Sequence, residues 1–408
     1  MGCAHPRTTD SFQLAEQMIR VAFIHNNFPA GGAERITMDI AAYLSTQEGR
    51  YESYVYASRI ASDKLPEDTG STLTVRKIPT DKIPFRKAAA IRKLIQEDRI
   101  DILVQVVKRV KGIGQIRRRT GCKVIFANHG VPFWEEHAII HRRRNNPAKK
   151  IFWKLLGKKI YLDMGRARKL AVRRSLRNYQ DCDAYTVLCE SYKRQICREL
   201  GIKPDASRVV SIYNPERSLP EVNYDKKNIV LFCGRLNAQK RVSRLLRIWA
   251  KVQEELPHWQ LKIVGDGPDR SMAESMIREL GLQRVSLEGW RSDTAAYYQE
   301  ASVLCLVSQY EGWPLALTEA QANGVIPIAF DCCDGVREIL SPEGVHGFTV
   351  EPFDEDAFAR TLVRVAGMSE EDKTEIRKNI VRRIRNFSPE NTAREWARLF
   401  DRLYDEKR

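Results

Sequence analysis

The sequence contains no apolar run that approaches the ~20 residues a transmembrane helix requires. Its longest apolar runs, YTVLCES and ASVLCLVS, have the length of single strands. Residues 1–17 lack the apolar core of a signal peptide, so we expect a disordered leader there and a cytoplasmic protein. With 408 residues, of which 43% are hydrophobic, the chain is long enough to form two domains with separate cores.

The nine cysteines include no CxxC pair of the kind that binds metals or carries out redox chemistry. Several lie in apolar, strand-like runs, where a thiol packs as a small hydrophobe. The adjacent Cys332 and Cys333 have no histidine nearby, which argues against a metal site. We therefore expect free thiols in a reducing compartment.

Two further signatures are missing or misplaced. No GxGxxG motif follows the first strand candidate, which argues against a nicotinamide cofactor. Asp-x-Asp occurs as DCD from Asp181 and as DED from Asp354, but the first precedes a strand and the second begins a polar helix. We expect neither motif to hold a cation.

Acidic residues are almost absent from residues 142–177, which hold fourteen basic residues and one acid, Asp163. Apolar residues recur there at near-helical spacing, which predicts a basic amphipathic segment over 142–178. A solvated helix is one interpretation, and nucleic-acid binding is disfavoured because no binding module accompanies the charge. We expect contact with an anionic membrane surface through Arg142, Arg143, Arg144, Lys149, Lys150, Trp153, Lys154, Lys158 and Lys159.

Short β-branched runs alternate with helical patterns along the whole chain, which predicts an α/β protein with parallel sheets covered by helices. The proline-containing stretch YNPERSLPEVNYDKKN separates two such doubly wound units. We predict a Rossmann-like acceptor domain over 18–215, a linker over 216–228, a Rossmann-like donor domain over 229–386, and a C-terminal helix over 387–408 that crosses back to the first domain.

Ligands of open parallel sheets bind beyond the carboxyl ends of the strands, so the loops there are the candidate site. Gly31 and Gly32 follow the first strand and precede a helix, which suits an anion, although a plain turn is equally compatible. Arg235 and Lys240 follow the first strand of the second unit, where they are expected to hold a diphosphate. A solvated basic loop is the alternative. Gly265 lies in the corresponding loop of the next strand.

The stretch SQYEGWPLALTEA places Glu311 at the end of a strand and Glu319 inside the helix that follows. The amides of Leu315 and Ala316, at the start of this helix, would attract an anion. A carboxylate can accept two hydrogen bonds from a vicinal diol, so Glu319 suits a ribose and Glu311 a sugar ring. Glu319 could instead merely stabilise the helix start electrostatically.

His129, in FANHGVPF, follows a strand of the first unit and is expected to face the same cleft. A purely structural histidine is the alternative interpretation.

Taken together, these motifs resemble the family 4 glycosyltransferases, which are retaining enzymes of the GT-B fold. The resemblance rests on GRLNAQKR, LKIVGDGPDR, VSLEGW, the E-x7-E spacing of Glu311 and Glu319, and DCCDGVREIL, with GGAER and NHG in the first half. It implies a nucleotide-diphosphate sugar donor, no required metal or cofactor, and a fold of two facing Rossmann-like domains.

The resemblance also implies roles for individual residues. The Gly31-Gly32 loop would close over the diphosphate, His129 would lie beside the donor sugar, and Glu311, His129, Arg235 and Lys240 would be catalytic. The donor contacts would include Gly312, Trp313, Leu315, Ala316, Gly265 and Glu319, with Trp290 and Arg291 near the base. Pro314 departs from the family pattern, because it removes one amide donor to phosphate.

The sequence therefore predicts a glycosyltransferase that moves a hexose or N-acetylhexosamine from a nucleotide-diphosphate sugar to a glycan acceptor. The expected nucleotide of the donor is UDP. A lipid-linked acceptor, surface polysaccharide or lipopolysaccharide synthesis, and attachment to the inner face of the membrane follow as expectations. A nucleotide-sugar epimerase of the same fold and a non-catalytic nucleotide-sugar-binding protein are the alternatives.

Overall fold

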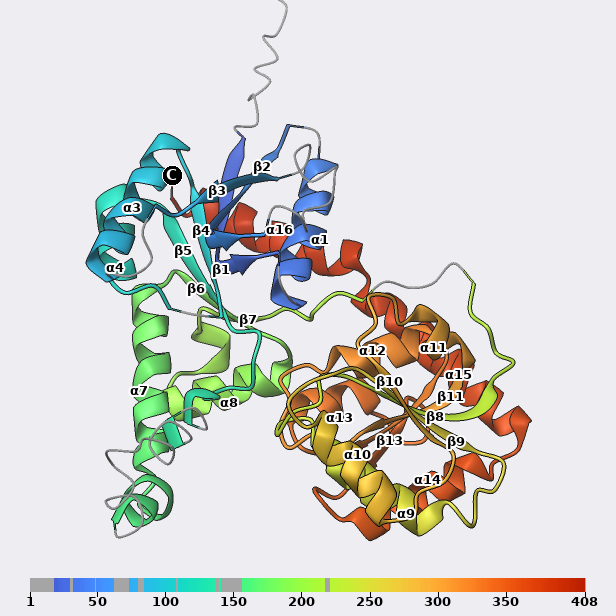
Figure 1. The fold of residues 1–408 in the computed structure, drawn as a ribbon. Coiled ribbons are helices and arrows are strands. Elements are labelled where there is room, and N and C mark those ends of the chain that lie inside the picture. The colour runs from blue at the N-terminus through green and yellow to red at the C-terminus, as the bar shows by residue number, and fades with distance from the viewer. Residues whose placement is uncertain are drawn as a thin grey trace, which may run out of the picture.

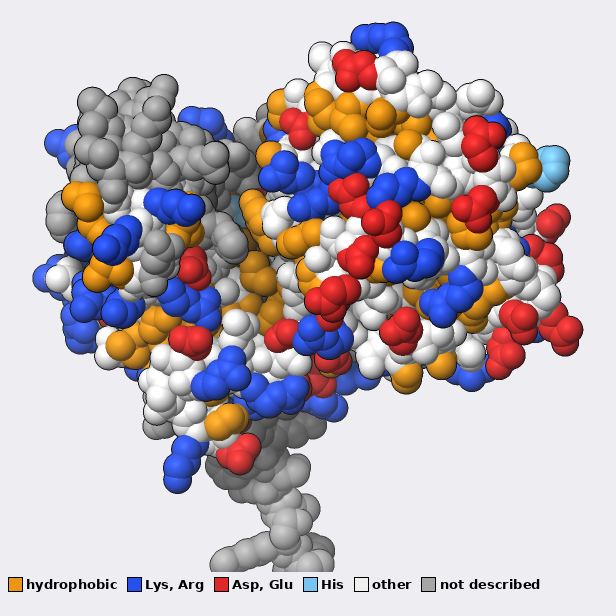
Figure 2. All heavy atoms as spheres, turned by 90° about the horizontal axis from the view of Figure 1, so that it is seen from below, with side chains coloured by type: hydrophobic (Ala, Val, Ile, Leu, Met, Phe, Trp, Pro, Cys, Tyr) orange, Lys and Arg blue, Asp and Glu red, His pale blue; other side chains and the backbone are white. Residues whose placement is uncertain are grey.

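The computed structural model describes residues 18–407 apart from 30–31, 48, 62–72, 80–83, 108, 137–138, 141–155 and 217–220. The predicted leader over 1–17 lies outside the described residues. The described part forms two parallel sheets, one in each half of the chain, each covered by helices (Figure 1). Seen from below, the two halves are separated by a hollow that has hydrophobic side chains along it (Figure 2).

The first sheet has seven strands in the order β3-β2-β1-β4-β5-β6-β7, and every pair of neighbours is parallel. Its strands are β1 Ile19–Phe28, β2 Tyr51–Ile60, β3 Thr74–Lys77, β4 Ile102–Val106, β5 Lys123–Ala127, β6 Ala184–Val187 and β7 Val209–Ser211. Its helices are α1 Gly32–Ser45, α3 Pro84–Glu97, α4 Ile113–Thr120, α7 Arg166–Asp181 and α8 Glu190–Leu200.

The second sheet has six parallel strands in the order β10-β9-β8-β11-β12-β13. They are β8 Lys227–Cys233, β9 Gln260–Val264, β10 Val285–Gly289, β11 Ala301–Leu306, β12 Ile326–Phe330 and β13 Phe348–Val350. The helices are α9 Val242–Val252, α10 Arg270–Glu279, α11 Ala295–Glu300, α12 Leu315–Ala322, α13 Asp334–Leu340, α14 Glu355–Ala366 and α15 Glu370–Ile384.

Side chains of β1 alternate between two cores, as the period of a strand requires. Ala22 and Ile24 belong to a cluster that also contains α3, α4 and α7 residues and continues into the second half of the chain. Val21 and Phe23 pack on the opposite face, against α1 and the last helix. A further cluster fills the second sheet and its helices. Because one apolar core joins both sheets, the two halves are packed together.

The last helix, α16 Pro389–Asp405, lies beside α1 against the first sheet, although it follows the second one in sequence (Figure 1). Trp396 and Phe400 are buried there, and the rings of Phe23 and Phe400 are 6.4 Å apart, edge to face. The Tyr51 hydroxyl donates to Asp401 at 2.7 Å. This helix therefore ties the end of the chain to the first sheet.

Candidate active site

Two helix amino termini, one from each half of the chain, meet at the junction of the two sheets. A Cβ atom added to Gly32, the first residue of α1, would lie 3.3 Å from Cδ1 of Leu315, the first residue of α12. Ala316 follows in the first turn of α12. Free amides and helix dipoles make such termini attractive to anions. Gly31 lies outside the described residues.

Lys240 and Glu311 form an ion pair of 2.7 Å beside this junction. The loop after β8 is shaped by Asn237, whose side-chain oxygen accepts from the amides of Gln239 and Lys240. The Gln239 side chain in turn donates to the carbonyl of Tyr310, which fixes this loop against the one that carries Glu311. The Glu311 carboxylate is only 6% exposed, so its charge requires a partner such as Lys240.

Glu319 lies one turn into α12 and has different neighbours. The Tyr298 hydroxyl donates to one of its carboxylate oxygens at 2.8 Å. The other oxygen lies 3.8 Å from the guanidinium of Arg35, which comes from α1 of the first half. Glu319 remains partly open to solvent, whereas Glu311 is buried.

Arg35 also pairs with Glu216, at 3.7 Å. Glu216 is buried and accepts from the Thr318 hydroxyl at 2.9 Å. Two carboxylates, one on α12 and one that accepts from α12, thus face one guanidinium from α1 of the first half. The arrangement places Arg35 as an electrostatic bridge across the junction.

The backbone around Gly312 touches the first half directly. A Cβ added to Gly312 would lie 2.9 Å from Cα of Gly130 and 3.0 Å from the carbonyl oxygen of His129. The buried Tyr192 hydroxyl, from α8, donates to the carbonyl of Gly312 at 2.9 Å and accepts from the amide of Gly335. The loop after Glu311 is therefore clamped against the loop that carries His129.

His129 is oriented by Asn214, whose side-chain oxygen lies 3.0 Å from Nδ1. Burial lowers the pKa of His129 to about 4, although the hydrogen bond to Asn214 opposes that shift. The imidazole is therefore neutral near pH 7, with Nδ1–H donating to Asn214 and a lone pair on Nε2. Nε2 can accept a proton or a hydrogen bond.

Not every predicted residue joins this group. Arg235 is exposed and has no ion pair within the described part of the chain. Trp290 is 72% exposed after β10, an edge strand, and Arg291 pairs with Glu288. Gly265 packs on the Lys240 loop instead: a Cβ there would lie 2.0 Å from the carbonyl oxygen of Gly234.

Trp313 lies in the core that joins the two halves. Its ring centroid is 5.3 Å from that of Tyr213 and 5.4 Å from that of Phe387, and its side chain is buried. The indole N–H has no acceptor among the described residues. Trp313 therefore packs in the core between the two halves. The predicted contact of Trp313 with a donor stays a prediction.

The basic segment over 142–178 is described only in part. Arg142, Arg143, Arg144, Lys149, Lys150, Trp153 and Lys154 lie outside the described residues. Lys158 and Lys159 are exposed on a short π-helical stretch that ends at Asp163. Gly165, in the left-handed conformation, separates this stretch from α7, which begins at Arg166.

The junction residues that sequence reasoning missed are Arg35, Tyr192, Asn214, Glu216 and Tyr298. Arg35 is the last residue of the GGAER motif, three positions after Gly32, so its place in that motif could have drawn attention. The others carry no local pattern that separates them from ordinary polar residues. Their role depends on contacts between distant segments.

The described residues contain no cluster of metal ligands and no apolar helix of membrane-spanning length. No group of three or more His, Cys, Asp or Glu side chains gathers there to hold a metal ion. The eight cysteines in this part of the chain are free thiols. Within the same residues, no helix is both long and apolar enough to cross a bilayer.

Comparison with known families covers almost the whole chain. Residues 216–386 match the family described as Glycosyl transferases group 1, and residues 30–215 match Glycosyltransferase Family 4. The chain belongs to the family 4 glycosyltransferases. The family predicted from the sequence motifs is thereby confirmed.

Two relatives show how far this glycosyltransferase is similar to known proteins. It is 26% identical over 397 residues, 94% of this chain and 98% of the other, to the Campylobacter jejuni GalNAc-alpha-(1->4)-GalNAc-alpha-(1->3)-diNAcBac-PP-undecaprenol alpha-1,4-N-acetyl-D-galactosaminyltransferase. Over 194 residues, 45% of this chain and 52% of the other, it is 34% identical to the Salmonella typhimurium lipopolysaccharide 1,6-galactosyltransferase.

Solved structures share the fold of this glycosyltransferase. The apo form of the lipopolysaccharide outer core galactosyltransferase WaaB matches with a TM-score of 0.66 and 21% identity, over 93% of this chain and 98% of that one. Anabaena HepE in complex with UDP and glucose matches with a TM-score of 0.70 and 16% identity, over 94% and 99%. The predicted GT-B architecture of two parallel-sheet domains is confirmed.

Proposed function

We propose that this glycosyltransferase moves a hexose or N-acetylhexosamine from a UDP-sugar to a glycan acceptor, with retention of configuration, in surface polysaccharide or lipopolysaccharide synthesis. The observation that carries the proposal is the junction itself. There, the starts of α1 and α12 face each other, Arg35 of α1 faces Glu319 of α12, and Lys240 pairs with Glu311, just before α12. The names of the Campylobacter and Salmonella relatives, and the UDP bound to HepE, support the substrate classes.

The donor's diphosphate would lie at the two helix starts, where free amides and dipoles favour negative charge. Lys240 would then exchange part of its contact with Glu311 for the phosphate, and the exposed Arg235 would add a second cation. Glu319, whose carboxylate is oriented by Tyr298, would accept hydrogen bonds from the ribose hydroxyls. Glu311 would do the same for the sugar.

Charge separation explains why these groups would accelerate transfer. When the bond from the sugar carbon to the diphosphate breaks, positive charge grows on the carbon and negative charge on the leaving oxygen. Lys240 and the helix starts stabilise the leaving group. A neutral His129 places no positive charge next to the developing cation, and its Nε2 can accept a hydrogen bond from a sugar hydroxyl.

The reaction then proceeds by attack of the acceptor on the same face from which the diphosphate departs. The junction carboxylates all have cationic partners: Glu311 pairs with Lys240, and Glu216 and Glu319 face Arg35, so none stands out as a free nucleophile. Mass spectrometry of the enzyme after rapid quenching with donor tests this route. A glycosyl adduct on any side chain would contradict it.

A lipid-linked acceptor and a location on the inner face of an anionic membrane complete the proposal. Exposed apolar side chains lie beside the exposed Lys158 and Lys159: Leu156 is 51% exposed, Leu162 42% and Met164 61%. This combination of apolar and basic residues suits an anionic interface.

The experiment that tests the donor class is a thermal-shift panel of UDP-, GDP- and ADP-sugars. Ligand binding raises the melting temperature with the logarithm of saturation, so UDP-sugars should give the largest shifts. Lys240→Gln should reduce the shift of every nucleotide. A larger shift with GDP or ADP would overturn the UDP assignment, and conversion of the donor to an epimer without acceptor, seen by NMR, would overturn transfer.

A further inference from the structure

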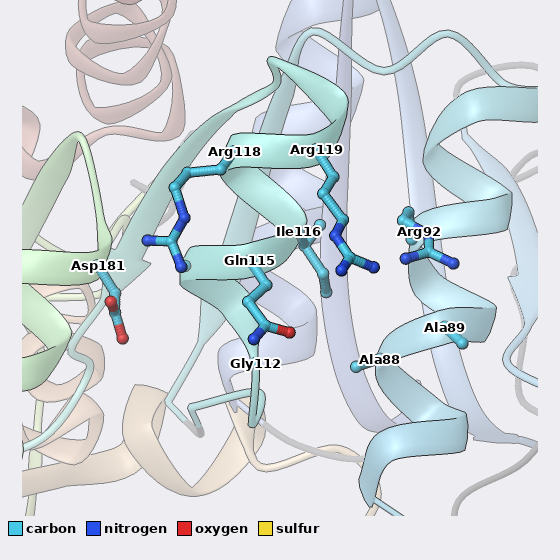
Figure 3. Close-up of a pocket in the computed structure, with 10 residues that line it drawn as sticks. Ala88, Ala89, Arg92, Gly112, Gln115, Ile116, Arg118, Arg119 and Asp181 are labelled. Carbon is cyan, nitrogen blue, oxygen red and sulfur yellow. The ribbon is translucent and has the colours of Figure 1, made fainter.

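A pocket of about 490 Å³ lies on the first domain, between α3 and α4 and next to the end of α7 (Figure 3). Its size is within the range of small-molecule sites. None of its lining residues belongs to the junction described above. We propose that this pocket is an anion site that binds a phosphate or diphosphate group through Arg92 and Arg119.

Small residues create the space. Ala88 and Ala89 line the α3 side, and Gly112 and Gly114 line the start of α4. A Cβ added to Gly114 would lie 2.5 Å from a carboxylate oxygen of Asp181, so a larger residue could not stand there unless Asp181 moved. Gly112 has a φ of 81°, which disfavours other residues. The opening is therefore built into the packing of the helices.

Two of the three arginines that line the pocket, Arg92 and Arg119, are directed at the same space. Figure 3 shows the guanidinium groups of Arg92 and Arg119 turned toward each other across the pocket, while Arg118 is directed toward Asp181. In the part of the chain that the structure describes, none of the three forms an ion pair or hydrogen bond. Like charges that face each other without a counter-charge repel, and an anion between them would remove that repulsion.

The nearby acids are already used by other arginines. Asp181 forms an ion pair with Arg109, which does not line the pocket. Asp183 pairs with Arg117, the neighbour of Arg118, at 2.7 Å. The pocket therefore keeps an excess of positive charge that the protein does not neutralise from the described residues around it.

Stabilisation of the α4 carboxyl terminus would account for some of this charge, since Arg117, Arg118 and Arg119 are in its last turn. It does not account for Arg92, which projects into the pocket from the middle of α3. Planar guanidinium groups from two helices match the geometry of phosphate oxygens, which they can bind in bidentate fashion. The chemistry indicates a phosphate-class ligand, from either a lipid headgroup or a soluble phosphorylated saccharide.

Calorimetric titration with inorganic pyrophosphate tests the proposal on the full-length protein, with UDP added to saturate the donor site. We expect Arg92→Gln/Arg119→Gln to weaken pyrophosphate binding by about tenfold or more, because two charge-assisted contacts are lost. The matched control is Arg394→Gln/Arg398→Gln, which removes the same charge from exposed positions on α16, outside the basic segment and away from the pocket lining. Equal weakening in both variants, or none in the first, would overturn the site.

The donor proposal can fail without affecting this test. If UDP does not bind, Lys240→Gln is used instead of UDP to disable the donor site, and pyrophosphate binding is compared between the two double variants in that background. Circular dichroism and melting temperature establish that each variant is folded.

Two further probes identify the source of the phosphate. Loss of binding to phosphatidylcholine vesicles that contain phosphatidic acid, in the pocket variant but not in the control, would support a lipid headgroup. The same selective loss with N-acetylglucosamine 1-phosphate would support a soluble saccharide. If the pocket variant retains both interactions at the level of the control, the site is not a phosphate site.

Discussion

Glu311 and Glu319 are eight positions apart in the sequence, but they differ in burial and partners. Glu311 is buried against Lys240, whereas Glu319 is partly exposed between Tyr298 and Arg35. A partly exposed carboxylate can exchange a solvent contact for a ligand hydroxyl at little cost. Removal of the buried Glu311 carboxylate, in contrast, leaves Lys240 without its partner.

Substitution should therefore separate the two roles. Glu319→Ala is expected to raise the donor Kd by about tenfold or more, because hydrogen bonds to a charged group are lost. Glu311→Ala is expected to lower kcat with a smaller effect on the donor Kd. Calorimetry with UDP and steady-state kinetics measure the two quantities, and the reverse pattern would show that the roles are interchanged.

Arg35 is expected to contribute to donor binding from the opposite domain. In Arg35→Ala, the carboxylates of Glu216 and Glu319 lose the cation that faces both, and the start of α1 is no longer drawn to α12. We expect the donor KM to rise about threefold to tenfold, with partial recovery in Arg35→Lys. Arg394→Ala, which removes an exposed arginine of α16, is the control for net charge. An unchanged donor KM would exclude this role.

His129 makes a prediction about acid stability. Its pKa in the folded protein is about 4, below the ordinary value of 6.5, because burial disfavours the charged ring. Between these values the unfolded chain binds a proton that the folded protein does not, so stability falls as the pH drops, by at most about 1.4 kcal/mol per pH unit. From about pH 7 to pH 5, the melting temperature of His129→Gln should fall less than that of the wild type. Equal slopes would contradict the assignment.

Among the elements, most strands were predicted well, but the two short edge strands of the first sheet were not. In the first sheet, β1, β2, β4, β5 and β6 are predicted by the runs IRVAFIHN, ESYVYAS, ILVQVV, KVIFANHG and AYTVLCES. All six strands of the second sheet are predicted by NIVLFCGRL, LKIVGDG, VSLEGW, VLCLVS, VIPIAF and GFTV, with ends that differ by a few residues. None of these runs predicts β3 or β7, which are the two edges of the first sheet. Both are short, and three of the four residues of TVRK are polar, so their pairing depends on the neighbouring strand more than on local pattern.

Gly312 is where two loops from different domains come closest. In Gly312→Ala, the added carbon would meet Gly130 at 2.9 Å, a distance that backbone atoms cannot relieve without moving the loops apart. We expect kcat to fall by about tenfold or more, since a displacement near 1 Å disturbs reacting groups. Gly367→Ala, at the end of α14 with a negative φ, is the matched control and should retain activity. Full activity in Gly312→Ala would show that the contact is dispensable.

At the scale of the molecule, the positive charge is uneven. The net charge is +16, and residues 142–177 supply fourteen basic residues against one acid. In the described part of this segment, Leu156, Leu162 and Met164 are exposed next to Lys158 and Lys159. A surface of this kind is attracted to anionic headgroups and inserts apolar side chains among them.

We expect the protein to co-sediment with phosphatidylglycerol-containing vesicles and to be released by salt, but not to bind pure phosphatidylcholine. Lys158→Gln/Lys159→Gln should reduce binding more than Lys251→Gln/Lys378→Gln, which removes the same charge from the second domain. Equal binding to both vesicle types, or equal loss in both variants, would contradict a specific basic surface.

The sequence by itself determined the two parallel-sheet domains, the family, and most of the loops from which the candidate site is built. These features follow from local patterns: apolar periodicity, glycines after strands, and the spacing of Glu311 and Glu319. The tertiary structure alone decided which groups meet. It paired Lys240 with Glu311, brought Arg35 from the other domain to Glu216 and Glu319, buried Trp313 in the shared core, and grouped Arg92 with Arg118 and Arg119. Such contacts join residues far apart in the chain, and their strength depends on burial and distance, which no local pattern encodes.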